Sequence, residues 1–288
     1  MTEHLLEMAK ARVRIRDGRI EVLSDPGIRC CPLRRDLYGI EEESQESVAR
    51  ALSLHMQEMG MYGPGRILEL DDKPVSFGAS EILSDAMSEG LVDAAVVVCE
   101  GAGTVVASRQ EVLQAIGAHM TGLVSTDPIP EIQRGLAERG CLLLDGQASV
   151  DQMRGLEKAA SAGYRKIAIT VAGAEAGDGA GQELRRRSEV LGVQALILAV
   201  HTTGISDCQA EALAENCDLV WSCASKAVRE VVGNKALLQI GIAIPVFALT
   251  DMGKRLILNR AQHFQGPLVL HRAGLPLAPQ EKQPEPLI

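Results

Sequence analysis

From Arg66 onward, short runs of β-branched and aliphatic residues alternate with segments of helical character. Strands that are almost continuously apolar are buried on both faces, which is typical of a parallel sheet covered by helices. We therefore expect an α/β fold whose mostly parallel, doubly wound sheet lies between helices in three layers. The runs are RILEL (66–70), AAVVVC (94–99), GLVST (122–126), CLLLD (141–145), KIAITV (166–171), ALILAV (195–200), DLVWSC (218–223) and IPVFALT (244–250).

A closed (βα)8 barrel is the alternative, because about eight units recur at spacings of roughly 19 to 29 residues. The stretch RILELDDKPVSF (66–77) favours the open sheet, since it is typical of a hairpin and not of a barrel unit.

The first 65 residues differ in pattern from this core. RVRIRDGRIEVL (12–23) alternates apolar and polar residues around Asp17-Gly18, which predicts a β-hairpin. A helix is expected from about Glu41 to Met59, before Gly63-Pro64-Gly65 break the chain. We expect an N-terminal hairpin and helix cap (1–65), an α/β core (66–270) and a proline-rich flexible tail (271–288).

Several helix starts are indicated inside the core. Ser108, Ser149 and Ser206 each precede a Glu or Gln by three residues, which is the spacing of a capping box. Asp127-Pro128 places a proline where the first turn of another helix is expected.

The composition excludes several classes of partner. The chain has 29 Lys and Arg against 38 Asp and Glu, a net charge of −9, and such a surface repels nucleic acid and anionic lipid. No apolar stretch reaches the roughly 20 residues that span a bilayer, and the start lacks a signal-peptide pattern. A cytoplasmic protein with no nucleic-acid or membrane partner is expected.

The ligand site of a parallel α/β fold lies at the carboxyl ends of its strands, where loops and helix N-termini converge. Residues that can donate hydrogen bonds to a small anionic ligand follow several predicted strands. The candidate ligand-binding residues are Gly101, Gly103, Thr104, Ser125, Thr126, Thr202, Thr203 and Ser225.

Four residues on the same predicted edge are candidates for catalysis. Cys223 precedes a predicted helix and Lys226 follows one turn later, so the helix dipole and the ammonium would both favour a thiolate. His201 ends another strand as an acid, base or ligand, and Glu100 supplies a carboxylate. The competing interpretation treats these as packing or hydrogen-bonded structural residues, because a cysteine after a buried strand is often a small apolar filler.

Cys31 lies in the cap segment CCPLRR (30–35), which could fold over this edge. If Cys31, Cys99 and Cys223 converge, their thiolates could hold an iron–sulfur cluster or a soft metal ion. Only the geometry of the fold can decide this.

Several segments spread over most of the chain point to a known family: Cys31-Pro32-Leu33, SFGASE (76–81), DAAVVVCEGAGTVV (93–106), IGAHMTGLVSTDPIP (116–130), VHTTGIS (200–206), CASKAVRE (223–230) and IPVFALT (244–250). In these segments the sequence resembles the methanogenesis marker protein 8 family, uncharacterised proteins of methanogenic archaea and some anaerobic bacteria. The resemblance implies an accessory or maturation role, with a protein partner, in anaerobic C1 or methane metabolism, and implies no catalytic residue.

Two functional interpretations remain open. In one, the thiols at the strand ends, with or without an iron–sulfur cluster, serve an enzyme or maturation factor. In the other, main-chain N–H groups and hydroxyls bind a phosphate or carboxylate in a non-catalytic module that acts on a partner protein.

Overall fold

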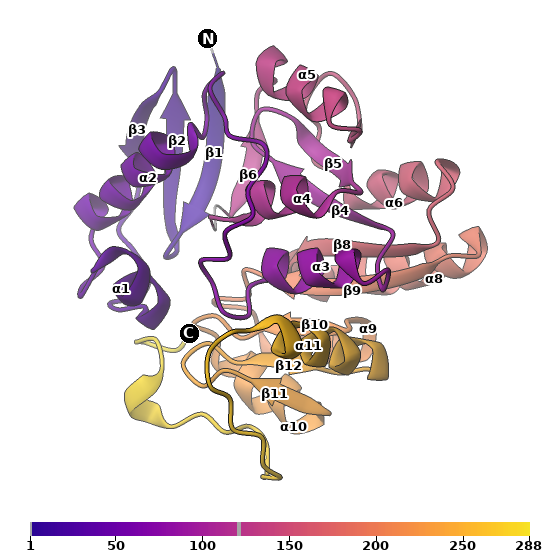
Figure 1. The fold of residues 1–288 in the computed structure, drawn as a ribbon. Coiled ribbons are helices and arrows are strands. Elements are labelled where there is room, and N and C mark those ends of the chain that lie inside the picture. The colour runs from indigo at the N-terminus through magenta and orange to yellow at the C-terminus, as the bar shows by residue number, and fades with distance from the viewer. Residues whose placement is uncertain (1, 120–121) are drawn as a thin grey trace.

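The computed structural model describes residues 2–119 and 122–288 (Figure 1). Across these residues the largest sheet has eight strands in the order β11-β12-β10-β9-β8-β4-β5-β7 and is open, with β11 and β7 at its edges. The predicted α/β architecture is therefore confirmed, and the alternative of a closed barrel is not. The strands are β4 (Ala94–Cys99), β5 (Gly103–Ala107), β7 (Leu142–Leu143), β8 (Lys166–Ala172), β9 (Gln194–Val200), β10 (Leu219–Trp221), β11 (Leu238–Ile240) and β12 (Val246–Ala248).

The centre of this sheet is parallel. β4 pairs with β8, β8 with β9, and β9 with β10, all in parallel, and the ladder between β8 and β9 runs from Lys166↔Gln194 to Ala172↔Val200. Antiparallel strands extend it on both sides, with β5 and β7 beyond β4, and β12 and β11 beyond β10. Because the four central strands run in parallel, their carboxyl ends lie side by side, along the edge of the sheet at which these strands end.

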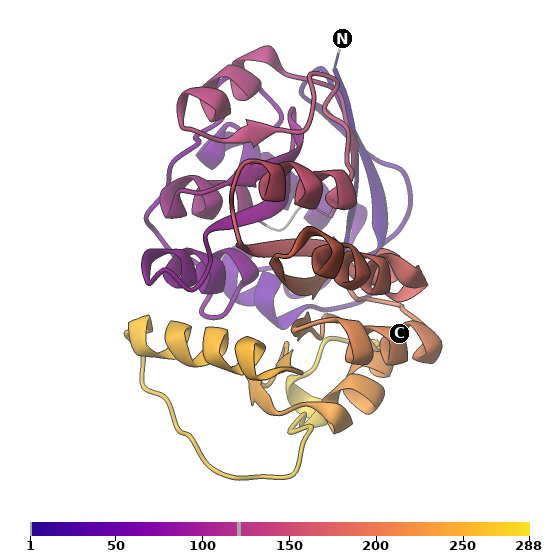
Figure 2. The same ribbon diagram turned by 90° about the vertical axis from the view of Figure 1, so that its right-hand side faces the viewer.

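Both faces of the sheet are buried. Along β4, Ala95, Val97 and Cys99 face one apolar core, whereas Ala94 and Val96 face the other, as the alternation of side chains in a strand requires. The first face packs against α3 (Ala79–Ser88), α4 (Gln110–Gly117), α5 (Pro130–Glu138) and α11 (Asp251–His263). The second packs against α6 (Gln152–Ser161), α8 (Gly181–Leu191), α9 (Asp207–Asn216) and the π-helical turn η2 (Val228–Val232). These layers match the predicted three-layer arrangement (Figure 2).

A second sheet, of four antiparallel strands, is built mainly from the N-terminal cap. Its order is β3-β2-β1-β6, with β1 (Glu3–Met8), β2 (Ala11–Arg16), β3 (Arg19–Val22) and β6 (Leu123–Thr126). The predicted hairpin at Asp17-Gly18 is present, and both residues have positive φ as a tight two-residue turn requires. The helices α1 (Pro32–Tyr38) and α2 (Gln45–Met59) accompany this sheet, and α2 buries Val48, Ala51 and Leu52 in its core.

Three local predictions were wrong. The run at 122–126 forms β6 in the N-terminal sheet, antiparallel to β1, and not a strand of the central sheet. Residues 66–77 form no strand, so neither the run at 66–70 nor the hairpin expected over 66–77 is present. The boxes at Ser108 and Ser149 do not form, because Arg109 precedes α4 and Asp151 caps α6, whereas Ser206 does form its box with Gln209.

The helix at residue 130 also begins later than expected. Pro130, and not Pro128, occupies its first turn. The strand β6 and the loop after it use residues 123–129, so the helix starts only when the chain has left the N-terminal sheet. The predicted division into cap, core and tail stays a prediction.

The chain after α11 takes a long external path before it returns to the body of the molecule (Figure 2). Residues 264–279 contain no helix or strand. A short 3-10 turn, η3 (Gln280–Lys282), follows, and Glu285 then pairs with Cys30 of the cap. Three short segments complete the helices: α7 (Gly173–Glu175), η1 (Ala176–Ala180) and α10 (Gly233–Lys235).

Candidate functional site

The predicted site residues that follow β4, β9 and β10 do share one edge of the central sheet, but they do not surround one cavity. Cys99 ends β4 and is completely buried in the core, whereas His201, just after β9, remains exposed to solvent. Cys223 follows β10 and is partly exposed. The edge therefore has two different environments, one at the end of β4 and one at the ends of β9 and β10.

The end of β4 is closed by buried charges. Glu100 is 3% exposed and forms an ion pair of 2.5 Å with Arg66, which also donates hydrogen bonds to the carbonyls of Ile67 and Ala115. Burial raises the pKa of the Cys99 thiol well above its usual value, and the Glu100 carboxylate raises it further. Glu100 is therefore committed to Arg66, and Cys99 is held as a thiol.

The glycine-containing loop after β4 is a hairpin turn, and not the entrance to a helix. Cys99 pairs with Gly103 across the antiparallel β4–β5 ladder. A Cβ atom at Gly103 would lie 2.3 Å from the main chain of Ala148, so the glycine permits close approach within the protein itself. Thr104 is buried, and its hydroxyl donates to Gln152 and accepts from the N–H of Asp151. These groups are satisfied internally, which argues against ligand binding there.

The N-terminal sheet covers this end of the edge. Thr126 is buried, and its hydroxyl accepts from the N–H of Gly101 at 2.8 Å and lies 2.6 Å from Nδ1 of His4. Ser125 faces solvent on β6. Gly101 and Thr126 thus join the two sheets, and Ser125 lies away from the predicted edge.

The loop after β9 braces the loop after β10. The Thr202 hydroxyl donates to the carbonyl of Trp221 at 2.6 Å and accepts from the N–H of Cys223, while the Thr203 hydroxyl accepts from the N–H of Ala224. The hydroxyls of Thr202 and Thr203 were predicted to contact a ligand, but they hold the β10 loop in place instead.

The β10 loop ends in a helical segment over residues 226–235. Ser225 caps it, since its hydroxyl accepts from the N–H of Val228 three residues later. The Lys226 side chain is exposed and lies 3.7 Å from Glu230, one turn further along the helix. The Lys226 ammonium, which was predicted to lie beside Cys223, is therefore directed toward Glu230.

A buried arginine, Arg229, lies beside Cys223, where sequence analysis placed Lys226. The Arg229 guanidinium donates to the Ser222 hydroxyl and to the carbonyls of Cys223 and Ser225, at 2.6 to 2.9 Å. It also donates to the side chain of Gln283 in the last segment of the chain. Burial lowers the pKa of Arg229 to about 10, and the nearby Cys223 opposes the shift. Arg229 was missed, because a charged residue on a largely apolar helix is ordinarily assigned to the surface.

The most informative contact lies between the two loops. The main-chain oxygen of Ile288 accepts hydrogen bonds from the N–H of Gly204 and from the N–H of Lys226, both at 3.3 Å. The N–H of Ile288 donates to the carbonyl of Ala224 at 2.9 Å. Donors from the ends of β9 and β10 thus converge on one oxygen, as expected of an anion-binding concavity at a helix N-terminus. We call these two N–H groups, of Gly204 and Lys226, the oxygen seat.

Two groups with titratable side chains lie beside the oxygen seat. Gly204 has a φ of +75°, and a Cβ atom there would lie 3.1 Å from Cε of Lys10, so the Lys10 side chain packs against it. The surrounding protein lowers the pKa of His201 through desolvation. The Glu7 carboxylate opposes this shift, and the Lys10 ammonium adds to it. Lys10 was also missed, because the tight turn at Ala9-Lys10 has positive φ without glycine or asparagine.

The predicted three-cysteine metal site is not formed. Burial raises the pKa of the Cys31 thiol, and Cys223 lies close enough to raise it further, whereas Cys99 is influenced by Glu100, Arg66 and Cys141 instead. Among residues 2–119 and 122–288, no group of three or more His, Cys, Asp or Glu side chains could hold a metal ion. The cap does fold over the edge, but it brings Cys31 only to the β10 end.

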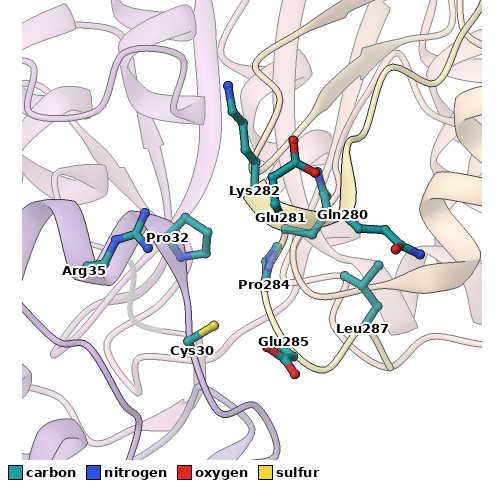
Figure 3. Close-up of a pocket in the computed structure, with 10 residues that line it drawn as sticks. Cys30, Pro32, Arg35, Gln280, Glu281, Lys282, Pro284, Glu285 and Leu287 are labelled. Atoms are coloured by element: carbon teal, nitrogen blue, oxygen red, sulfur yellow. The ribbon is translucent and has the colours of Figure 1, made fainter.

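A cavity of about 460 Å³ lies between α1 and the last segment of the chain (Figure 3). Cys30, Pro32 and Arg35 line one side, and Lys282, Glu285 and Leu287 belong to the other. Its lining carries two cations, Arg35 and Lys282, and two carboxylates, Glu281 and Glu285, so the charges balance.

Comparison with known proteins identifies relatives but no established activity. A family model described as "Uncharacterized protein conserved in archaea (DUF2099)" matches residues 4–262. The chain is 35% identical over 290 residues to Uncharacterized protein MJ0054 of Methanocaldococcus jannaschii, with complete coverage of both chains. No solved structure matches. Within the described residues, the helices lack the combined length and apolar character that crossing a membrane needs.

Proposed function

This chain belongs to the family of uncharacterised proteins conserved in archaea (DUF2099), and we propose that it binds a small carboxylate- or phosphate-bearing ligand at the oxygen seat. One observation carries the proposal: N–H groups from two separate strand ends, at Gly204 and Lys226, converge on the same oxygen atom of Ile288. Lys10, whose ammonium lies 3.2 Å from a Glu7 carboxylate oxygen, supplies a cation next to Gly204. A carboxylate or phosphate oxygen could accept the same two hydrogen bonds, and such charge-assisted bonds are stronger than those between neutral groups.

The same geometry favours a binding module over a thiol-dependent enzyme. A nucleophilic or metal-bound cysteine must be a thiolate, but burial and Glu100 hold Cys99 as a thiol and the three cysteines are not grouped. Cys223 stays partly exposed at the end of β10, and His201 is accessible beside Glu7 and Lys10 at the end of β9. We assign His201 a role in ligand recognition.

The biological setting is part of the proposal. The resemblance to methanogenesis marker protein 8 supports an accessory role in anaerobic C1 or methane metabolism, in the cytoplasm. In this role the ligand-bound protein would act on a protein partner. The archaeal family and the archaeal relative agree with this setting without naming a substrate.

The test removes one donor of the oxygen seat. Lys226→Pro deletes the N–H at the first position of a helix, where proline is tolerated, and Ser225 before it is already a cap residue. Acetate and inorganic phosphate are titrated separately at constant ionic strength, and the Gly204 amide resonance is followed by NMR. We expect affinity to fall by less than the roughly tenfold of a lost hydrogen bond to a charged group, because the Ile288 oxygen that the ligand displaces loses the same donor.

The matched control is Lys226→Ala, which removes the exposed ammonium and keeps the N–H. Its affinity should stay within about twofold of the parent chain, because the side chain points to Glu230. Equal affinities for the proline and alanine variants would contradict the proposal.

A further inference from the structure

The last residues of the chain lie across the cap and the core at once. The main chain of Glu285 exchanges two hydrogen bonds with Cys30 and accepts a third from the N–H of Arg29. Gln283 accepts from Arg229 and donates to the carbonyl of Ile242. Ile288 fills the oxygen seat. Residues 283–288 are therefore an ordered strap, attached at three points.

The attachments of Glu285 and Ile288 use main-chain groups of exposed residues, whereas Gln283 and Pro284 are buried. The ion pair of Arg29 with Glu285 joins two side chains that are 56% and 62% exposed, and Ile288 itself is 40% exposed. The chain leading to the strap is also exposed, with Val269 at 86% and Leu270 at 70%. A segment with few buried apolar contacts opens at a lower free-energy cost than the core does.

The oxygen seat is the point where strap and ligand meet. Both would use the N–H groups of Gly204 and Lys226, so they cannot bind together. The strap also forms one wall of the cavity beside α1 (Figure 3), so its departure would open that cavity as well as the seat.

We propose that residues 284–288 are a displaceable lid that occupies the oxygen seat as an intramolecular competitor of the ligand. This rests on the proposed function, since it assigns regulation to the same site. The affinity of the full chain is then the affinity of the open seat multiplied by the fraction of molecules whose lid has left. Binding of a ligand also releases Glu285 from Cys30, so it loosens the contact between cap and core.

The experiment compares the full chain with a variant lacking residues 284–288. Acetate and inorganic phosphate are the probes, titrated at constant ionic strength by calorimetry or NMR. We expect the shortened chain to bind at least one of them about tenfold more tightly, because the competitor is absent. A synthetic peptide PEPLI, added at millimolar concentration, should return the affinity toward that of the full chain, whereas the reversed peptide ILPEP should not.

A second variant releases the lid without shortening the chain. Glu285→Pro removes the N–H that donates to Cys30, whereas Glu285→Ala keeps it and removes only the exposed ion pair. We expect a gain in anion affinity of about threefold for the proline variant and none for the alanine variant. Gln283 and its contact with Arg229 are intact in both, so the β10 loop keeps its support.

The outcomes separate the lid from the function on which it rests. Equal anion affinity in the full and shortened chains, together with weaker binding by Lys226→Pro, would overturn the lid and leave the proposed function in place. If neither anion binds to the full chain or to the shortened chain, the proposed function is overturned, and the lid with it. Tighter binding that PEPLI reverses supports both.

Discussion

The two ends of the same sheet edge differ in what covers them. At the end of β4, the N-terminal sheet seals Glu100 and Arg66 among His4, Tyr62 and Thr126, all of them buried. At the ends of β9 and β10, the cover consists of the turn at Ala9-Lys10 and the last residues of the chain, held mainly through main-chain groups. Parallel topology places loops on one edge, but the segment that covers each loop decides whether it can meet a ligand.

Breaking the buried ion pair between Arg66 and Glu100 should have the largest effect on the sealed end, the one at β4. Glu100→Leu leaves the Arg66 guanidinium buried without its carboxylate, which typically costs about 3–5 kcal/mol of unfolding free energy. Urea unfolding measures this change. The control is the double variant Arg66→Met/Glu100→Leu, which should recover most of the loss because neither charge remains. If the single variant were as stable as the parent, the end of β4 would not be sealed.

Acid should destabilise the N-terminal cap, where His55 of α2 is buried and stacks on His119. Burial, together with His119, lowers the pKa of His55 to about 3, from an ordinary value near 6.5. The folded protein then binds fewer protons than the unfolded chain, so stability is present at pH 7 and is lost as pH falls below about 6.5. At roughly 1.4 kcal/mol per pKa unit, His55 alone accounts for about 3 kcal/mol between pH 7 and pH 4.

The measurement is the urea midpoint as a function of pH. In His55→Gln the loss between pH 7 and pH 4 should shrink, whereas His263→Gln, at the more exposed end of α11, should follow the parent. Burial also lowers the pKa values of His4 and His119, so part of the slope should remain in His55→Gln. An unchanged slope would show that His55 is protonated without opening the core.

Local sequence patterns predicted the helices and strands whose own residues carry a turn signal or an apolar run. The Asp17-Gly18 hairpin, the helix ending at Met59 and the parallel strands β8, β9 and β10 each carry their own turn signal or apolar run. β6 does not, because its place beside β1 depends on a pairing between residues more than 110 positions apart, such as His4 and Thr126. Short apolar runs fit either sheet until that partner is known.

Sequence analysis predicted main-chain N–H donors and hydroxyls at the strand ends, but it did not single out the N–H of Lys226. Strand ends were correctly placed on one edge, yet the hydroxyls of Thr202, Thr203 and Ser225 are used by the protein itself. The donors left for a ligand are main-chain N–H groups, which every residue carries, so no side-chain pattern marks them. Gly204 was the available signal, since its positive φ and its packing against Lys10 require a residue without a side chain.

Cysteine labelling compares the two ends of the sheet edge with the least perturbation, because it requires no change in sequence. Cys99 is completely buried and burial raises its pKa, so iodoacetamide should leave it unmodified in the folded protein. Cys223 and Cys30 are partly exposed and Cys208 is exposed, so these three should react about a hundredfold faster or more. Mass spectrometry of timed digests gives each rate, and unfolding in urea is the control that should equalise them. Alkylation of Cys99 at the rate of Cys223 under native conditions would mean that the cover over β4 opens as readily as the lid over the oxygen seat, and the contrast between the two ends would disappear.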